Sequence, residues 1–310
     1  MFGRLETSKH IIPDETECSS RRDALSKLIL LPVLSSTPEF SWAATDSPFS
    51  FQQAESSQLA VGLLEARVTE NVLSPPPYGM EVPDIIYPSW FQGTWQISSR
   101  TTDVQAPCGA ALFGGNATLE RAKNEIGTTL QYDARFISTT TSTGAIVADR
   151  YYNVQSIAKA AMGEFSVMDI PVATPNKLTC VLLPKGSPRM LQVDLIALNR
   201  RQETISDLQF DCSEVTREIV APVNNNNAPP QQQPQSNNNN NNNNNPILKE
   251  IETTSLYTYN PSKNEITCQQ RSATFLLPSQ TSPIAYKMWE AARGRPIDTR
   301  FYQVRYTKKG

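Results

Sequence analysis

The sequence predicts a mainly β fold, a single antiparallel β-barrel of about eight to ten strands, from three observations. Long runs of alternating apolar and polar residues cover most of the chain after residue 87. Period-two alternation means that one face of a strand is buried and the other is wet. Roughly ten such strands strain an open twisted sheet, so we expect the sheet to close. The motif Gly93-Thr94-Trp95 opens the first run, where a large indole can plug the narrow end of a barrel.

Residues 1–43 have the features of an export leader. Arg21 and Arg22 precede the apolar run 28–34, and residues 41–43 offer the small side chains that a signal peptidase reads. This pattern is typical of a twin-arginine signal cleaved after Ala43, the alternative being a basic turn before a short buried helix. Acidic residues before the arginines are unusual in a plastid transit peptide, so a bacterial-type leader or an incomplete start stays open. No other stretch approaches ~20 apolar residues, so we expect no transmembrane segment in the mature chain.

Charge and histidine content narrow the classes of function. The formal net charge is −2, which gives no electrostatic reason to expect a nucleic acid or an acidic membrane surface as partner. The one histidine, His10, lies in the predicted leader. Without it, the mature chain lacks the commonest metal ligand and the commonest general base. We therefore favour a protein that is not an enzyme and uses no metal or other cofactor; in an enzyme, Asp149 or Glu214 would have to act as the base.

The mature chain divides into a lead-in and a barrel. Residues 44–86 hold a short amphipathic helix, expected over 54–72, and then a proline-rich extended strap. Residues 87–310 form the barrel domain. Its Asn/Gln-rich insertion, 221–246, cannot bury apolar area, and we expect a disordered loop between two strands.

The barrel strands follow the alternating runs, and two helices interrupt them. After the strand that holds Trp95, the predicted strands cover residues 130–136, 145–152, 164–170, 178–183, 191–197, 208–220, 251–259, 265–277 and 298–307. An Ala-rich helix is expected over 154–162, ended by Gly163. A second is expected over 282–293, with Ser as N-cap, Pro in the first turn and Gly294 after the end. Gly114-Gly115-Asn116 lacks the context of a phosphate loop and predicts a turn.

Four cysteines remain after the leader: Cys108, Cys180, Cys212 and Cys268. An oxidising compartment would permit disulfides, and four cysteines allow three pairings. In a sequential meander, however, the last three lie on strands about two positions apart, or ~9.6 Å, beyond the ~7 Å that a bridge spans. We favour buried free thiols. No Cys-x-x-Cys motif is present, so no structural zinc is expected.

Charged residues within or beside the strands are the candidate site residues: Asp149, Arg150, Arg271, Asp298 and Arg300. One interpretation places them at a polar pocket mouth, where arginines grip a carboxylate through paired hydrogen bonds. The other, which we favour, is structural ion pairing between neighbouring strands.

Two resemblances add to this interpretation. Gly93-Thr94-Trp95 at the start of an up-and-down barrel resembles the first motif of the lipocalin and calycin superfamily. In lipocalins an arginine from a late strand lies across that indole, which implies that Arg300 or Arg305 covers Trp95.

Four local patterns form the second resemblance: residues 88–95, Ala148-Asp149-Arg150 with Asn153, residues 270–274 and residues 294–300. Together they resemble an uncharacterised family of cyanobacterial and plastid proteins, a domain of unknown function associated with the thylakoid lumen. The resemblance covers residues 88–308 apart from the insertion. It implies a chloroplast, lumenal β-barrel and no known activity.

Two hypotheses for function follow. The first is a lumenal binding module that holds a small hydrophobic ligand such as a pigment, a lipid or a quinone-like molecule. The second is an assembly or accessory factor that binds a photosynthetic membrane complex through its surface. The size of the inward-facing residues separates them, and large rings favour a filled or narrow interior: Tyr132, Phe136, Phe210, Tyr257 and Phe275.

Overall fold

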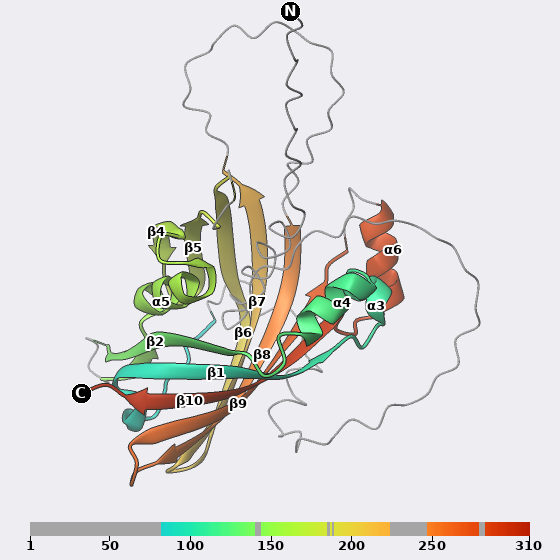
Figure 1. Ribbon diagram of the computed structural model, residues 1–310. Coiled ribbons are helices and arrows are strands. Elements are labelled where there is room, and N and C mark those ends of the chain that lie inside the picture. Colours follow the sequence, from blue (N-terminus) through green and yellow to red (C-terminus); the bar gives the residue numbers. More distant parts are fainter. Residues whose placement is uncertain (1–81, 140–143, 185–186, 188, 224–246, 279–282) are drawn as a thin grey trace, which may run out of the picture.

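The computed structural model describes residues 82–139, 144–184, 187, 189–223, 247–278 and 283–310 (Figure 1). The predicted leader, the expected helix over 54–72 and most of the Asn/Gln-rich insertion lie outside the described residues. Among the helices that are described, none combines the length and the apolar character needed to cross a bilayer.

A single antiparallel sheet of ten strands forms the body of the domain, which confirms the predicted mainly β fold. The strands are β1 Gly93–Gln105, β2 Thr129–Ser138, β3 Ile146–Ala148, β4 Val167–Ala173, β5 Lys177–Leu182, β6 Leu191–Ser206, β7 Gln209–Pro222, β8 Ile247–Asn260, β9 Glu265–Leu276 and β10 Asp298–Lys308. They are ordered β3-β2-β1-β10-β9-β8-β7-β6-β5-β4.

The strand order is that of an up-and-down barrel with one missing seam. Strands β4 to β10 form a meander, and β10 then pairs with β1, so the two ends of the domain are hydrogen-bonded neighbours. The free edges are β3 and β4, which are consecutive in the chain. The sheet curls into a half-barrel and does not close (Figure 1), so the prediction of a closed barrel is wrong.

Helix α5, Arg150–Met162, lies in the gap where the sheet fails to close. Strand β3 has three residues because Asp149 follows it at once and caps α5, accepting a hydrogen bond from the backbone N–H of Tyr152 at 3.1 Å. Strand β4, on the other edge, is irregular in its pairing with β5. The helix packs beside β2 and β4 (Figure 1) and so covers the open side of the half-barrel. The predicted helix 154–162 is confirmed, with an earlier start, and the predicted strand 145–152 shrinks to β3.

Two apolar clusters lie on the concave face of the sheet. The first gathers aromatic side chains around Trp95 and Phe91, both fully buried, with Phe136, Phe210 and Tyr257. The second lies under α5, where small helix residues such as Ala158 meet side chains of β4 to β7: Ile170, Leu178, Leu182, Val193 and Val220. Tilted and edge-to-face ring contacts fix the first cluster, while the small residues of α5 let the helix approach the strands closely. Between the clusters the side chains do not fill the space.

A 3-10 helix, Ser89–Phe91, leads into β1, and the remaining α-helices lie at one end of the sheet (Figure 1). Helices α3, Ala110–Phe113, and α4, Asn116–Lys123, follow β1 and were not predicted. They are separated by the predicted turn, in which Gly114 and Gly115 have positive φ angles of 114° and 95°. Helix α6, Pro283–Ala292, confirms the helix expected over 282–293.

Candidate functional site

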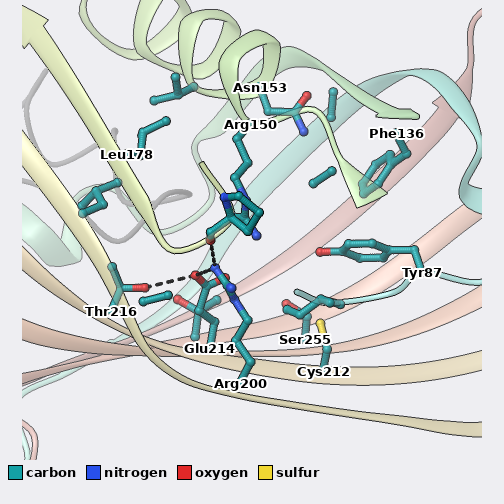
Figure 2. Close-up of a pocket in the computed structure, with 18 of the residues that line it drawn as sticks. Tyr87, Phe136, Arg150, Asn153, Leu178, Arg200, Cys212, Glu214, Thr216 and Ser255 are labelled. Carbon is teal, nitrogen blue, oxygen red and sulfur yellow. Dashed lines mark hydrogen bonds and ion pairs between the residues drawn. The ribbon is translucent and has the colours of Figure 1, made fainter. Parts of the chain in front are cut away.

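A cavity of about 200 Å³ lies on the concave face of the sheet, beneath α5 and between the two apolar clusters. Its aromatic side is lined by rings of the first cluster: Tyr87, Tyr132, Phe136, Tyr257 and Tyr306. Its opposite side carries residues of the second cluster and a group of charged side chains (Figure 2). The large rings therefore fill only part of the interior. Phe210 is buried within the first cluster, whereas Tyr132 and Tyr257 border the cavity.

Two arginines and a glutamate form the polar wall of the cavity, and the carboxylate of Asp84, which is not among the lining residues, pairs with the arginines. Arg150, the first residue of α5, and Arg200, on β6, approach each other from opposite sides of the cavity (Figure 2). Arg150 donates to Asp84 at 2.5 Å, and Arg200 Nη1 lies 3.9 Å from the same carboxylate. Arg200 also pairs with Glu214 of β7 at 3.0 Å. The four groups form one charge-balanced network, here called the polar quartet.

The two arginines differ in how much of their hydrogen-bonding capacity is used. Arg200 is 3% exposed and donates to Glu214, to the Asn176 side chain at 3.0 Å and to the Pro175 carbonyl at 2.5 Å. Arg150 is 23% exposed, and Asp84 is the one acceptor that it has among the described residues. Burial lowers the pKa of Arg150, but Glu214 and Asp84 outweigh burial and the net shift is upward, so the residue stays charged.

The phenols and the thiol at the aromatic end stay protonated. Burial raises the pKa of Tyr87, Tyr132, Tyr257 and Tyr306, and it does the same for Cys212. These groups are neutral at physiological pH, so the aromatic side of the cavity carries no charge. Within the described residues, no three His, Cys, Asp or Glu side chains come together as a metal site.

Of the charged candidate site residues Asp149, Arg150, Arg271, Asp298 and Arg300, Arg150 alone lines the cavity. Asp149 caps α5 and pairs with Arg135 at 2.6 Å. Arg271 pairs with buried Glu252 at 2.5 Å. Both contacts are ion pairs within the protein.

A second buried charge cluster lies outside the cavity, where Arg300 links β10 to the segment after α4. Its side chain is 5% exposed, and it contacts Glu125 at 2.9 Å and Asp298 at 3.0 Å. Burial raises the pKa of Asp298, although Arg300 opposes the shift. The cluster fixes the end of the sheet that carries α3 and α4.

The prediction that Arg300 or Arg305 covers Trp95 is wrong. A cation from the last strand does cover the indole, but it is Lys308, whose Nζ lies 4.3 Å from the ring centroid. Arg300 is held in the buried charge cluster, and Arg305 is 64% exposed beside Glu265. Alternation along β10 places Arg305 on the outer face, whereas Lys308 reaches the indole from the end of the strand.

Two members of the polar quartet, Arg200 and Asp84, were missed in the sequence. Arg200 follows the irregularity between Ala197 and Asn199 in the pairing of β6 with β7, which breaks simple alternation along β6. Glu214 was considered only as a base for an enzyme. Asp84 lies in the proline-rich segment before the sheet, and nothing in its local pattern indicates a buried partner.

Comparison with known proteins gives a family and no activity. No curated protein and no solved structure matches the chain. One family model matches residues 79–310, which span the whole sheet, α5 and the cavity. The chain therefore belongs to the family described as Domain of unknown function (DUF6816).

Proposed function

We propose that this protein is a small-molecule binding module that holds a hydrophobic ligand between α5 and the concave face of the sheet. The observation that carries the proposal is the cavity itself, apolar and ring-lined on one side and polar on the other. Ligand sites in proteins commonly combine an apolar lining with a few polar groups that fix orientation. In this proposal the protein holds its ligand inside the curved sheet, as a lipocalin does. Three features support the comparison: an up-and-down sheet, a Gly-x-Trp motif on the first strand and a cation over the indole.

The size of the cavity limits the ligand. A volume of about 200 Å³ exceeds the ~150 Å³ that suffices for benzene in an engineered apolar cavity. It is smaller than the ~300–1,000 Å³ of sites for drug-sized molecules. A substituted single ring, such as the head of a quinone-like molecule, fits this space better than a tetrapyrrole pigment or a whole lipid.

A cavity-filling variant tests the proposal. Ala197 lines the cavity, and Ala197→Phe places a ring in the space that the ligand would occupy. Ala173→Phe is the matched control, because Ala173 lies on the exposed surface of β4. Isopropylbenzene should raise the melting temperature of the wild type and of Ala173→Phe, and should leave that of Ala197→Phe unchanged. Equal shifts in all three proteins would place binding elsewhere, and no shift in the wild type would contradict the proposal.

An assembly or accessory factor is the second candidate, favoured by one surface feature. Phe165 is 88% exposed in the turn before β4, and Met168 is 52% exposed on β4, which is a free edge of the sheet. Exposed apolar side chains beside an open strand edge suit a protein partner, here a photosynthetic membrane complex. The double variant Phe165→Ser/Met168→Ser should then lose co-sedimentation with washed thylakoid membranes, while Ile205→Ser, at another exposed apolar position, keeps it. A wild-type protein that stays in the supernatant would exclude this function.

The proposed compartment is the plastid thylakoid lumen, with a bacterial periplasm as the alternative. Arg21 and Arg22 before a short apolar run support transport by the twin-arginine route and cleavage after Ala43. Replacing both arginines with lysine should block processing in an import assay with isolated plastids. Unchanged processing of that variant would contradict the assignment.

A further inference from the structure

Arg150 is the more exposed arginine of the polar quartet and the one with fewer acceptors among the described residues. Arginine carries donors on Nε and on both terminal nitrogens. Both terminal nitrogens of Arg200 already have acceptors, and that side chain is almost completely buried. Arg150 has the single acceptor Asp84 among the described residues, on Nη2, and its side chain is 23% exposed, whereas Nε of both arginines is buried without a partner there. A guanidinium so placed in a cavity wall can take one more acceptor.

The charge balance of the quartet decides which acceptor fits. Arg150 and Arg200 are two cations, and Asp84 and Glu214 are two anions, all within one connected network. The remaining charged residue of the lining, Lys177, is 48% exposed and faces Asp194 at 3.9 Å. A carboxylate ligand would therefore bring an uncompensated negative charge next to Asp84 and Glu214. Burying an unpaired charge costs far more than burying a neutral acceptor that is hydrogen-bonded.

The aromatic side of the cavity determines what the rest of the ligand should be. The rings of Tyr87, Tyr132, Phe136, Tyr257 and Tyr306 present apolar faces and edges. Aromatic side chains prefer ring partners in stacked or edge-to-face geometry. The available 200 Å³ accommodates one such ring with small substituents.

We propose that the ligand is a neutral single-ring compound that bears a carbonyl oxygen, of the ketone, amide or quinone type. The ring lies among the tyrosines, and the carbonyl oxygen accepts a hydrogen bond from Arg150. Arg200 and Glu214 are positioning residues that hold Asp84 and, through it, the Arg150 side chain. This inference rests on the proposed binding function and narrows its ligand class.

Three probes of the same size separate the alternatives: acetophenone, isopropylbenzene and benzoate. Each has one ring and the same number of non-hydrogen atoms. The first carries a neutral carbonyl, the second has no acceptor and the third is an anion. Dissociation constants come from equilibrium dialysis against the purified full-length protein at pH 7. We expect acetophenone to bind about tenfold more tightly than isopropylbenzene, because a hydrogen bond to a charged donor is added. Benzoate should bind at least about tenfold more weakly than acetophenone.

Two variants assign the effect to Arg150. Arg150→Lys keeps the positive charge but removes the planar fork of donors, and lysine is compatible with the first turn of α5. This substitution should lower the affinity for acetophenone to that for isopropylbenzene, and it should leave the affinity for isopropylbenzene unchanged. Arg305→Lys makes the same substitution on an exposed residue outside the cavity, and it should change neither affinity. Circular dichroism checks that both variants are folded.

Each outcome decides the proposal. The expected ranking, lost in Arg150→Lys alone, supports it. If benzoate binds most tightly, the natural ligand is an anion and not a neutral compound. If acetophenone and isopropylbenzene bind equally, Arg150 makes no hydrogen bond to the ligand. Either result overturns the proposed ligand class but leaves the binding function standing. If none of the probes binds the wild type, the binding function itself fails. The wild-type ranking decides between these results even if Arg150→Lys does not fold.

Discussion

Lys308 covers the face of Trp95, with Nζ 4.3 Å from the ring centroid, and the two residues are paired across β10 and β1. The indole is fully buried and donates from Nε1 to the Phe91 carbonyl at 2.6 Å, so its orientation is fixed from both sides. Lys308 also donates to the Gln92 carbonyl. Because β1 and β10 are the first and last strands, this contact ties the two ends of the domain together.

We expect Trp95→Ala to lower the free energy of unfolding by ~3–5 kcal/mol, since it leaves a cavity in the aromatic cluster. Lys308→Ala should cost ~0.5–2 kcal/mol, the range of a cation–π contact. The two losses should be less than additive, because without the indole the lysine has no ring to cover. Urea unfolding of the double-mutant cycle measures this coupling. Arg305→Ala is the control and should combine additively with Trp95→Ala; strict additivity for Lys308→Ala would show that the contact contributes nothing.

Gly93 makes room for this lysine. Its φ is +111°, a region that residues with a Cβ avoid, and a Cβ there would lie 3.0 Å from Lys308 Nζ and 3.2 Å from its Cε. Gly93→Ala should therefore destabilise the domain by ~1–3 kcal/mol from backbone strain, and the lysine must move from the ring. Thermal unfolding measures the loss. Gly310→Ala meets no neighbouring atom and should leave the melting temperature unchanged; an equally neutral Gly93→Ala would show that this backbone is not constrained.

Sequence patterns predicted the strands well, because alternation reports a local property of each strand. Runs such as Leu191 to Ala197 keep one face inward, and β6 follows them. Closure was mispredicted because it depends on one junction: Asp149 caps a helix immediately after β3, which leaves an edge three residues long. Alternation cannot show that α5 replaces the missing strand pairing.

The site was only partly predictable for the same physical reason. Arg150 could be selected as a charged residue beside a strand, but its partners come from distant elements. Asp84 is 66 residues away from it along the chain, and Arg200 is brought to Asp84 by the curl of the sheet. Such convergence depends on tertiary packing, whereas Gly163 at the end of α5 is a local signal and was predicted correctly.

The described cysteines should differ sharply in reactivity. Cys180, Cys212 and Cys268 are buried free thiols, as predicted, and Cys108 is a free thiol that is partly exposed. Burial raises the pKa of all four, that of Cys180 to about 12, while Arg295 partly offsets the shift at Cys108. Because the thiolate is the reactive form, iodoacetamide at pH 8 should label Cys108 first and the other three only after unfolding. Peptide mass spectrometry resolves the sites; cysteines that resist labelling in denaturant without reductant would instead be disulfide-bonded.

The Asn/Gln-rich insertion joins two strands that are already neighbours. Val220 of β7 pairs with Ile247 of β8, so the intervening residues connect the two strands of an antiparallel hairpin. Loop-closure entropy grows slowly with loop length, and a tract of this composition buries little apolar area. Replacing residues 224–245 with a short Gly/Ser linker should therefore shift the melting temperature by no more than a few degrees. Differential scanning calorimetry of both proteins measures the shift, with acetophenone binding as a check that the cavity is intact. A larger fall in melting temperature would mean that the tract stabilises the domain through contacts of its own, and its composition would then be a poor guide to its role.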